Sequence, residues 1–245
     1  MRRYYKNLGR SVLSVSIISA IAMFSGTTMA EGFTVEKLIT LDSVHSAVIS
    51  PDGASLIYGH QKVSDSGKVS NLYLKNLNDA TSSDIQLTNH QAKEHDVVWS
   101  NDGKSIYFIS SRSGSSQVWR LSLTGGEAIQ ITDLSVDVNG LKVSPDNKKI
   151  AVALSVFVDC KDLKCTSERL KSLNDKPNQG REYTQLMVRH WDTWSDHTFN
   201  HIFVGDLGER NVTNLIDINQ GLHTDIPAKP FSGMEEVSFS SDSKQ

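Results

Sequence analysis

The sequence predicts an all-β fold, a β-propeller of four-stranded antiparallel blades, and two kinds of repeat support this prediction. The first is a turn motif of the form Ser-x-Asp, which occurs four times with its aspartates 50, 44 and 96 residues apart. A repeated unit of this length with one tight turn in each copy is typical of a propeller blade. The four copies are Ser50-Pro51-Asp52-Gly53, Ser100-Asn101-Asp102-Gly103, Ser144-Pro145-Asp146-Asn147 and Ser240-Ser241-Asp242-Ser243.

The residue types of this motif suit a hairpin turn. Proline sets the backbone of the first central position of a type I turn, and aspartate hydrogen-bonds nearby backbone amides. Glycine or asparagine accepts the positive φ that lets two strands continue antiparallel. Apolar runs flank the turns: residues 97–99 precede Asn101 and residues 106–109 follow Gly103. Each turn is therefore predicted to join the first and second strands of a blade.

The second repeat is a third strand that carries an aromatic residue at its third position. Residues 71–77, 117–123 and 201–207 align in this way, and residues 85–88 and 129–132 supply a fourth strand in two copies. Blades are therefore expected at about residues 44–90, 95–133 and 139–216. A fourth blade is expected to begin with a strand at residue 236, so residues 31–245 are expected to hold only part of a propeller, three blades and one further strand.

The first thirty residues have the pattern of a secretory signal peptide. Four basic residues precede an apolar run from Val12 to Phe24, and small residues at Thr28 and Ala30 favour cleavage before Glu31. The alternative is a membrane anchor, but the run is shorter than the roughly 20 residues that span a bilayer. Residues 1–30 are thus expected to direct export to the periplasm or the medium, with no membrane attachment after cleavage.

Charge excludes some classes of partner. The formal net charge of −3 becomes −7 without residues 1–30, because that segment holds four basic and no acidic residues. A surface with this balance is a poor match for nucleic acid or an anionic membrane, so neither is expected as a partner.

A long insertion, residues 158–200, separates the second and third strands of the third blade. It begins with the cysteines Cys160 and Cys165, for which an exported chain and a short loop favour a disulfide. Free thiols and half of a metal site are the alternatives, although no other cysteine is present to complete such a site. A short polar helix is expected over residues 166–173. Long excursions from a compact scaffold are usually functional or disordered, and the tryptophans at 191 and 194 favour an ordered segment.

Four side chains in or near this insertion suggest a metal site at first sight: His190, Asp192, His197 and His201. Their spacing is irregular. His201 also opens a strand whose equivalent residues in the other blades, Asn71 and Gln117, are poor metal ligands. We therefore expect His190, Trp191 and Asp192 to pack and hydrogen-bond the insertion against the edge of the blade, and we expect neither a metal nor a cofactor.

Two motifs of the insertion give the chain a resemblance to a known family. They are Asp159-Cys160-Lys161-Asp162-Leu163-Lys164-Cys165 and Val188-Arg189-His190-Trp191-Asp192-Thr193-Trp194. With the signal peptide and the turn repeat, over about residues 34–245, the chain resembles the N-terminal propeller of exported bacterial serine peptidases of the prolyl oligopeptidase family. The match is strongest to dipeptidyl-peptidase and acylaminoacyl-peptidase-like members.

The resemblance implies a propeller that covers an active site and admits short peptides. The family's catalytic serine, aspartate and histidine belong to an α/β-hydrolase domain, with the serine in a Gly-x-Ser-x-Gly turn. No such turn occurs in these 245 residues, so no catalytic residue is assigned.

In some members of the family, acidic groups of the propeller hold the free amino terminus of the substrate. The matching candidates here are Glu235 and Glu236, since paired carboxylates bind an ammonium group well. Neighbouring side chains of a strand point to opposite faces, however, so in a strand only one of them would reach a given ligand.

Two functions from different classes remain at this stage. The first is the substrate-gating, non-catalytic propeller of an exported serine peptidase that cleaves short peptides. The alternative is a periplasmic propeller that binds a protein partner, as in the Tol system.

Overall fold

The computed structural model describes residues 32–64, 67–177, 180, 182–184, 186 and 188–244. The expected signal peptide, residues 1–30, lies outside them. The chain divides into two units, residues 1–39 and 40–245. The described part of the first unit includes most of a short helix, α2 (Val35–Thr40), none of whose residues is buried. No helix among the described residues is long and apolar enough to cross a membrane.

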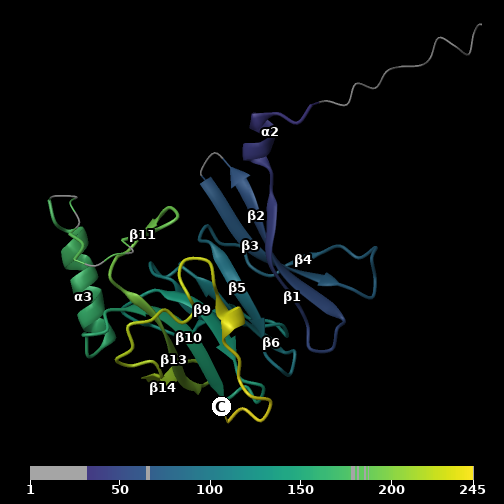
Figure 1. Ribbon diagram of the computed structural model, residues 1–245. Coiled ribbons are helices and arrows are strands. Elements are labelled where there is room, and N and C mark those ends of the chain that lie inside the picture. Colours follow the sequence, from purple (N-terminus) through teal and green to yellow (C-terminus); the bar gives the residue numbers. More distant parts are fainter. Residues whose placement is uncertain are drawn as a thin grey trace, which may run out of the picture. The chain divides into compact units, whose positions relative to one another are not determined.

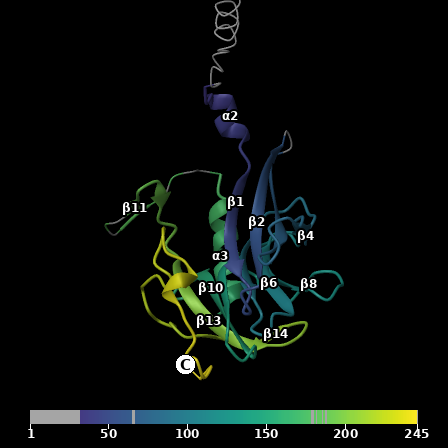
Figure 2. The same ribbon diagram turned by 90° about the vertical axis from the view of Figure 1, so that its right-hand side faces the viewer.

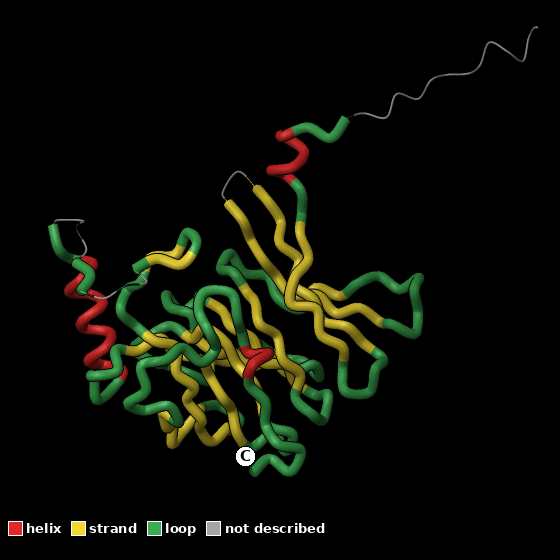
Figure 3. The backbone as a smooth tube through the Cα atoms, viewed as in Figure 1, coloured by secondary structure: helices red, strands yellow, loops and turns green. Residues whose placement is uncertain are grey.

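The second unit contains three four-stranded antiparallel sheets, and the predicted all-β class with four-stranded blades is confirmed (Figures 1 and 3). The first sheet comprises β1 (Ser43–Ile49), β2 (Ser55–Ser64), β3 (Gly67–Asn76) and β4 (Ile85–Gln86). The second sheet comprises β5 (Glu94–Trp99), β6 (Ser105–Ser110), β7 (Gln117–Ser122) and β8 (Ile129–Gln130). The third sheet comprises β9 (Val138–Val143), β10 (Lys149–Val156), β13 (Phe199–Leu207) and β14 (Val212–Asp217).

The insertion lies between β10 and β13, as expected, and contains helix α3 (Leu163–Asn174) and a small hairpin, β11 (Arg189–His190) with β12 (Thr193–Trp194). The helix begins three residues earlier than the sequence suggested. The reason is the cap at Asp162, whose carboxylate accepts a hydrogen bond from the Cys165 N–H at 2.8 Å. This contact satisfies one of the free amides of the first turn.

The four Ser-x-Asp turns share one hydrogen-bond pattern. In each, the serine hydroxyl donates to the aspartate carboxylate, over 2.5 Å in the first copy and 2.7 Å in the last. This hydrogen bond is the main cause of the lowered pKa of all four aspartates. The residue after the aspartate has positive φ in every copy, which explains its identity: Gly53, Gly103, Asn147 and Ser243.

Where that last residue has a polar side chain, it links one turn to the preceding turn. The Asn101 N–H donates to Asn147 Oδ1 at 2.8 Å, and the Asp146 N–H donates to Ser243 Oγ at 3.1 Å. The Asn147 and Ser243 side chains therefore join neighbouring turns, and a glycine at the same position could not make this hydrogen bond.

A second polar position repeats in the third strand of each sheet. Asn71 accepts the His90 N–H at 2.8 Å, and Gln117 accepts the Leu134 N–H at 3.0 Å. In the third sheet His201, 1% exposed, contacts Asp217 Oδ2 through Nδ1 at 2.8 Å and the Leu222 carbonyl through Nε2 at 2.9 Å. All three side chains hydrogen-bond the segment that follows the fourth strand of their sheet. The contacts of His201 are therefore structural.

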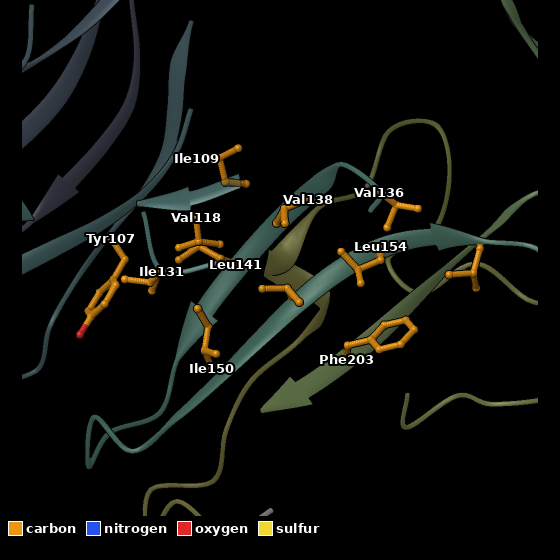
Figure 4. Close-up of a cluster of buried hydrophobic side chains, with 12 residues drawn as sticks. Tyr107, Ile109, Val118, Ile131, Val136, Val138, Leu141, Ile150, Leu154 and Phe203 are labelled. Carbon is orange, nitrogen blue, oxygen red and sulfur yellow. The ribbon is translucent and has the colours of Figure 1, made fainter. Parts of the chain in front are cut away.

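The core lies between facing sheets (Figure 4). One face of β10 contacts the second sheet through Ile150, Val152 and Leu154, all fully buried. The opposite face, with Ala151, Ala153 and Ile202, is covered by apolar side chains of a later segment: Ile226, Met234, Val237 and Phe239. Both faces of the third sheet are therefore buried.

The segment after residue 233 differs from the strand expected to begin at residue 236. Met234–Glu236 form a 3₁₀ helix, and residues 237–240 pair with no strand within the described part of the chain. Val237 is nevertheless extended, with φ −115° and ψ 135°, and its carbonyl accepts a hydrogen bond from Lys142 Nζ. Packing against the third sheet holds this segment, but without a neighbouring strand the ladder that defines a β-strand does not form.

A hydrogen-bonded chain joins the first two sheets at β1 and β5. Ser70 Oγ donates to the Glu94 carbonyl at 3.0 Å, so it accepts from His45 Nε2, 2.6 Å away. His45 Nδ1 then accepts from Ser46 Oγ at 3.1 Å, and Ser46 in turn accepts the Asp96 N–H at 3.2 Å. The neutral ring, which donates through Nε2 and accepts through Nδ1, fits this arrangement. Burial lowers the pKa of His45, and Lys93 and His95 lower it further, against the opposing effect of Asp96.

A core truncation tests the packing between sheets. Leu154→Ala removes a fully buried side chain between the second and third sheets, and we expect a loss of about 2–5 kcal/mol in the free energy of unfolding. The matched control is Leu186→Ala, because Leu186 is 96% exposed, and its effect should stay within about 0.5 kcal/mol. Denaturant titration measures both. Equal effects would contradict the core described here.

The lowered pKa of His45 predicts a pH-dependent stability. The unfolded chain takes up a proton near the ordinary value of 6.5, whereas the folded chain does so at lower pH. Below this value the unfolded state therefore binds more protons, and the free energy of unfolding should fall with falling pH. Thermal melts from neutral to mildly acidic pH should show a shallower slope for His45→Gln than for the control His60→Gln. An unchanged slope in His45→Gln would count against the prediction.

Candidate functional site

Glu235 and Glu236 lie in the 3₁₀ helix, and each carboxylate turns back onto the loop of residues 225–236. Glu236 Oε2 accepts the Ala228 N–H at 3.0 Å, and Glu235 Oε1 accepts the Gly233 N–H at 2.8 Å. Hydrogen bonds from Ser232 and from the Ala228 amide lower the pKa of Glu236. The expectation that the two side chains point to opposite faces of a strand is wrong, because the residues are not in a strand. Both are exposed beside one loop.

The β11–β12 hairpin carries a group of exposed aromatic and cationic side chains. Trp191 is at its tip with φ of +53°, and it is 77% exposed. The Arg189 guanidinium lies 5.2 Å from the ring centre of Trp194, and its Nε donates to the Trp191 carbonyl at 2.7 Å. Tyr183 stacks on Trp194 with 6.1 Å between ring centres. The hairpin is thus held largely by its own side chains.

The hairpin meets the Glu235–Glu236 loop at Phe231. The Phe231 ring lies edge-to-face with His190 at 5.5 Å and with Trp191 at 6.3 Å, and 69% of this phenylalanine is exposed. Figure 2 shows the yellow loop rising toward the green hairpin. We call this group of side chains the recognition corner; it comprises Tyr183, His190, Trp191, Trp194, Phe231, Glu235 and Glu236.

The chemistry of the recognition corner is specific. Carboxylates hold an ammonium group through charge-assisted hydrogen bonds, and exposed aromatic rings bind apolar side chains or cations. The two segments meet at Phe231, which belongs to the same loop as the carboxylates. Sequence reasoning found the carboxylates and the tryptophans but missed Phe231 and Tyr183. Phe231, just after Pro230, falls outside every repeat.

The four side chains considered for a metal do not gather. His201 is buried on β13 with Asp217, His190 contacts Phe231, and His197 packs on Tyr183 at 5.3 Å. No group of three or more potential metal ligands occurs among the residues that the structure describes. His190 packs, as expected, although its aromatic partner is Phe231 of a later loop.

Cys160 and Cys165 form a disulfide at the start of the insertion, with 5.5 Å between their Cα atoms. The closed loop contains Asp162, the cap of α3. Arg169 adds a second fastening, because both ends of its guanidinium contact the Asp159 carboxylate at 2.8 Å. A cavity of about 460 Å³ beside this loop is lined mainly by apolar side chains, among them Phe157, Leu163 and Phe203.

Comparison with known proteins identifies the family. The model of the TolB beta propeller domain matches residues 35–239, which is most of the chain. The chain belongs to this family. The TolB-type propeller described here is also similar to dipeptidyl-peptidase 5 of Porphyromonas gingivalis, with 33% identity over 236 residues, 95% of this chain and 33% of that protein. Dipeptidyl-peptidase 5 of Porphyromonas endodontalis is 26% identical over 220 residues, 89% of this chain and 30% of that protein.

Among solved structures, acylaminoacyl peptidase of Pyrococcus horikoshii has a TM-score of 0.51 and 12% identity over 74% of this chain and 26% of that chain. At this identity the likeness concerns the fold of the propeller alone. The chain spans about a third of the length of the two dipeptidyl-peptidases. The resemblance to peptidase propellers that the insertion motifs suggested is confirmed at this level.

The disulfide gives a direct chemical test. We expect an unreduced digest of the protein to contain the peptides of Cys160 and Cys165 as one cross-linked species in mass spectrometry. Replacing both cysteines by serine should cost about 2 kcal/mol of unfolding free energy, because the closed loop is short. Free thiols at both positions in the isolated protein would overturn this prediction.

Proposed function

We propose that this propeller is the non-catalytic, substrate-gating part of an exported serine peptidase that cleaves short peptides. The observation that carries the proposal is the recognition corner, where His190 and Trp191 of the insertion contact Phe231, which lies in the same loop as two exposed carboxylates. A peptide with a free amino terminus has the matching chemistry, an ammonium group beside a side chain. The similarity to proteins named dipeptidyl-peptidase 5 supports the same substrate class.

In this proposal the propeller contributes binding and access, whereas bond cleavage belongs to a hydrolase domain of the same protein. Amide hydrolysis needs a nucleophile with a positioned base, and the family's nucleophile motif is absent from these 245 residues. The described residues alone should therefore hydrolyse no peptide. Residues 1–30 are proposed to direct the protein out of the cytoplasm.

The second candidate is a propeller that binds a protein partner, as in the Tol system, and the match to the TolB propeller model favours it. The two candidates differ in one experiment. The complete protein encoded by the gene is incubated with dipeptidyl and acylaminoacyl chromogenic substrates. Turnover that a serine-directed inhibitor abolishes supports the peptidase, and the absence of turnover by the complete protein supports the binding propeller.

The carboxylates give a quantitative test in the complete protein. Glu235→Gln and Glu236→Gln each remove one charge that would face the ammonium group, and we expect KM for a dipeptidyl substrate to rise roughly tenfold or more for at least one of them. The effect on kcat should be smaller, since the amino terminus is bound before and during the reaction.

Glu127→Gln is the matched control, because this glutamate is exposed and distant in sequence from the recognition corner. With a substrate whose amino terminus is acetylated, the Glu235→Gln and Glu236→Gln variants should have the same KM as the parent protein. If all three glutamine variants have the parent KM, the carboxylates do not bind the substrate.

A further inference from the structure

The loop that carries Glu235 and Glu236 has one cationic side chain that reaches the insertion. Lys229 Nζ donates to the Thr198 carbonyl at 3.0 Å and to Thr198 Oγ1 at 2.9 Å. It also lies 3.7 Å from the Asp225 carboxylate and 4.0 Å from that of Asp196. The side chain is only 29% exposed, so these contacts are partly shielded from water.

The partners of Lys229 belong to two different segments. Asp196 and Thr198 lie at the end of the insertion, directly after the β11–β12 hairpin, and Thr198 Oγ1 donates to Asp196 Oδ1 at 2.7 Å. Asp225 begins the Glu235–Glu236 loop, and its carboxylate accepts the Asn200 N–H at 2.8 Å. One ammonium group therefore lies between the carboxylates of both segments. Its removal would leave Asp196 and Asp225 near one another without a cation between them.

Other contacts fix the loop to the sheet. Asn200 binds the Ile226 and Pro227 backbone, and Met234 packs so closely on Gly140 that a Cβ at residue 140 would lie 2.6 Å from Met234 Cγ. Among the contacts described above, the hairpin meets the loop where His190 and Trp191 contact Phe231. Lys229 hydrogen-bonds Thr198 in the short segment that joins the hairpin to β13.

We infer that Lys229 is a positioning residue that holds the insertion hairpin and the Glu235–Glu236 loop in one fixed arrangement. It does not touch the bound peptide. It sets the distance between the aromatic rings at Trp191 and the carboxylates, which must match the distance between a side chain and the amino terminus of the peptide. The kinetic part of this inference rests on the proposed function, whereas the structural part does not.

The structural test uses hydrogen exchange on the complete protein. The reporters are the Ser195 N–H, bonded to the Val188 carbonyl, and the Ala228 and Gly233 amides, bonded to the glutamates. Lys229→Met should speed exchange in residues 188–198 and 225–236 together, on the order of tenfold. Lys229→Arg should restore protection, because arginine keeps the cation. Lys148→Met is the control, an exposed lysine beside Asp146.

The kinetic test compares the same variants on a dipeptidyl substrate. Lys229→Met should raise KM on the order of tenfold and leave kcat within about twofold, and Lys229→Arg should recover most of the loss. Faster exchange in the loop alone, or in neither segment, overturns the inference whatever the activity. A further outcome is that Lys229→Met loses protection in both segments while the parent protein shows no peptidase activity. That result would support Lys229 as the link between the segments and would reject the proposed function.

Discussion

Burial of both faces of the third sheet is the constraint on which the rest of this propeller depends. Its second strand is apolar at five successive positions, residues 150–154, and all five are buried. One face has a partner in the second sheet, but the face with Ala151 and Ala153 needs another cover. Exposed apolar surface of this kind is unfavourable by about 25 cal/mol per Å². Ile226, Met234, Val237 and Phe239 supply the cover.

The same cover explains where the recognition corner lies. Ile226 and Met234 are anchored on the sheet, so the residues between them must arch away from it. Phe231 is in this arch and is exposed for that reason, and the glutamates follow directly after Met234. The side chains of this loop that belong to the recognition corner are thus placed by the apolar residues on either side of them.

The sequence predicted most of the scaffold because the scaffold repeats. Four copies of a turn and three copies of a third strand identify the blade, and the alignment of His201 with Asn71 and Gln117 argued against a metal role for this histidine. The structure shows what the alignment did not predict, its contacts with Asp217 and the Leu222 carbonyl. Strand bounds followed from the same alternation of apolar residues and turns.

The candidate site was less predictable because it does not repeat. The alignment with earlier turns suggested a strand at residue 236, yet a 3₁₀ helix forms where no second strand pairs with the segment. Phe231 and Lys229 act through residues about 30 to 40 positions earlier in the chain, His190 and Thr198. A single sequence carries no pattern for such contacts, since they depend on how two irregular segments pack.

The position of the insertion in the third sheet accounts for its contact with this loop. In the second sheet the connection between β6 and β7 is short, residues 111–116, and leaves no room for a helix or hairpin. In the third sheet the chain leaves β10 through the disulfide and α3 and must return to the start of β13, where Thr198 and Asn200 already bind Lys229 and Asp225. The two ends of the insertion are therefore fixed independently, one by a covalent bond and one by a polar cluster. The hairpin lies between these two ends, and Trp191 at its tip meets Phe231. A peptide that enters between these rings would displace an edge-to-face contact of modest strength, about 0.5–1.5 kcal/mol, without breaking either anchor.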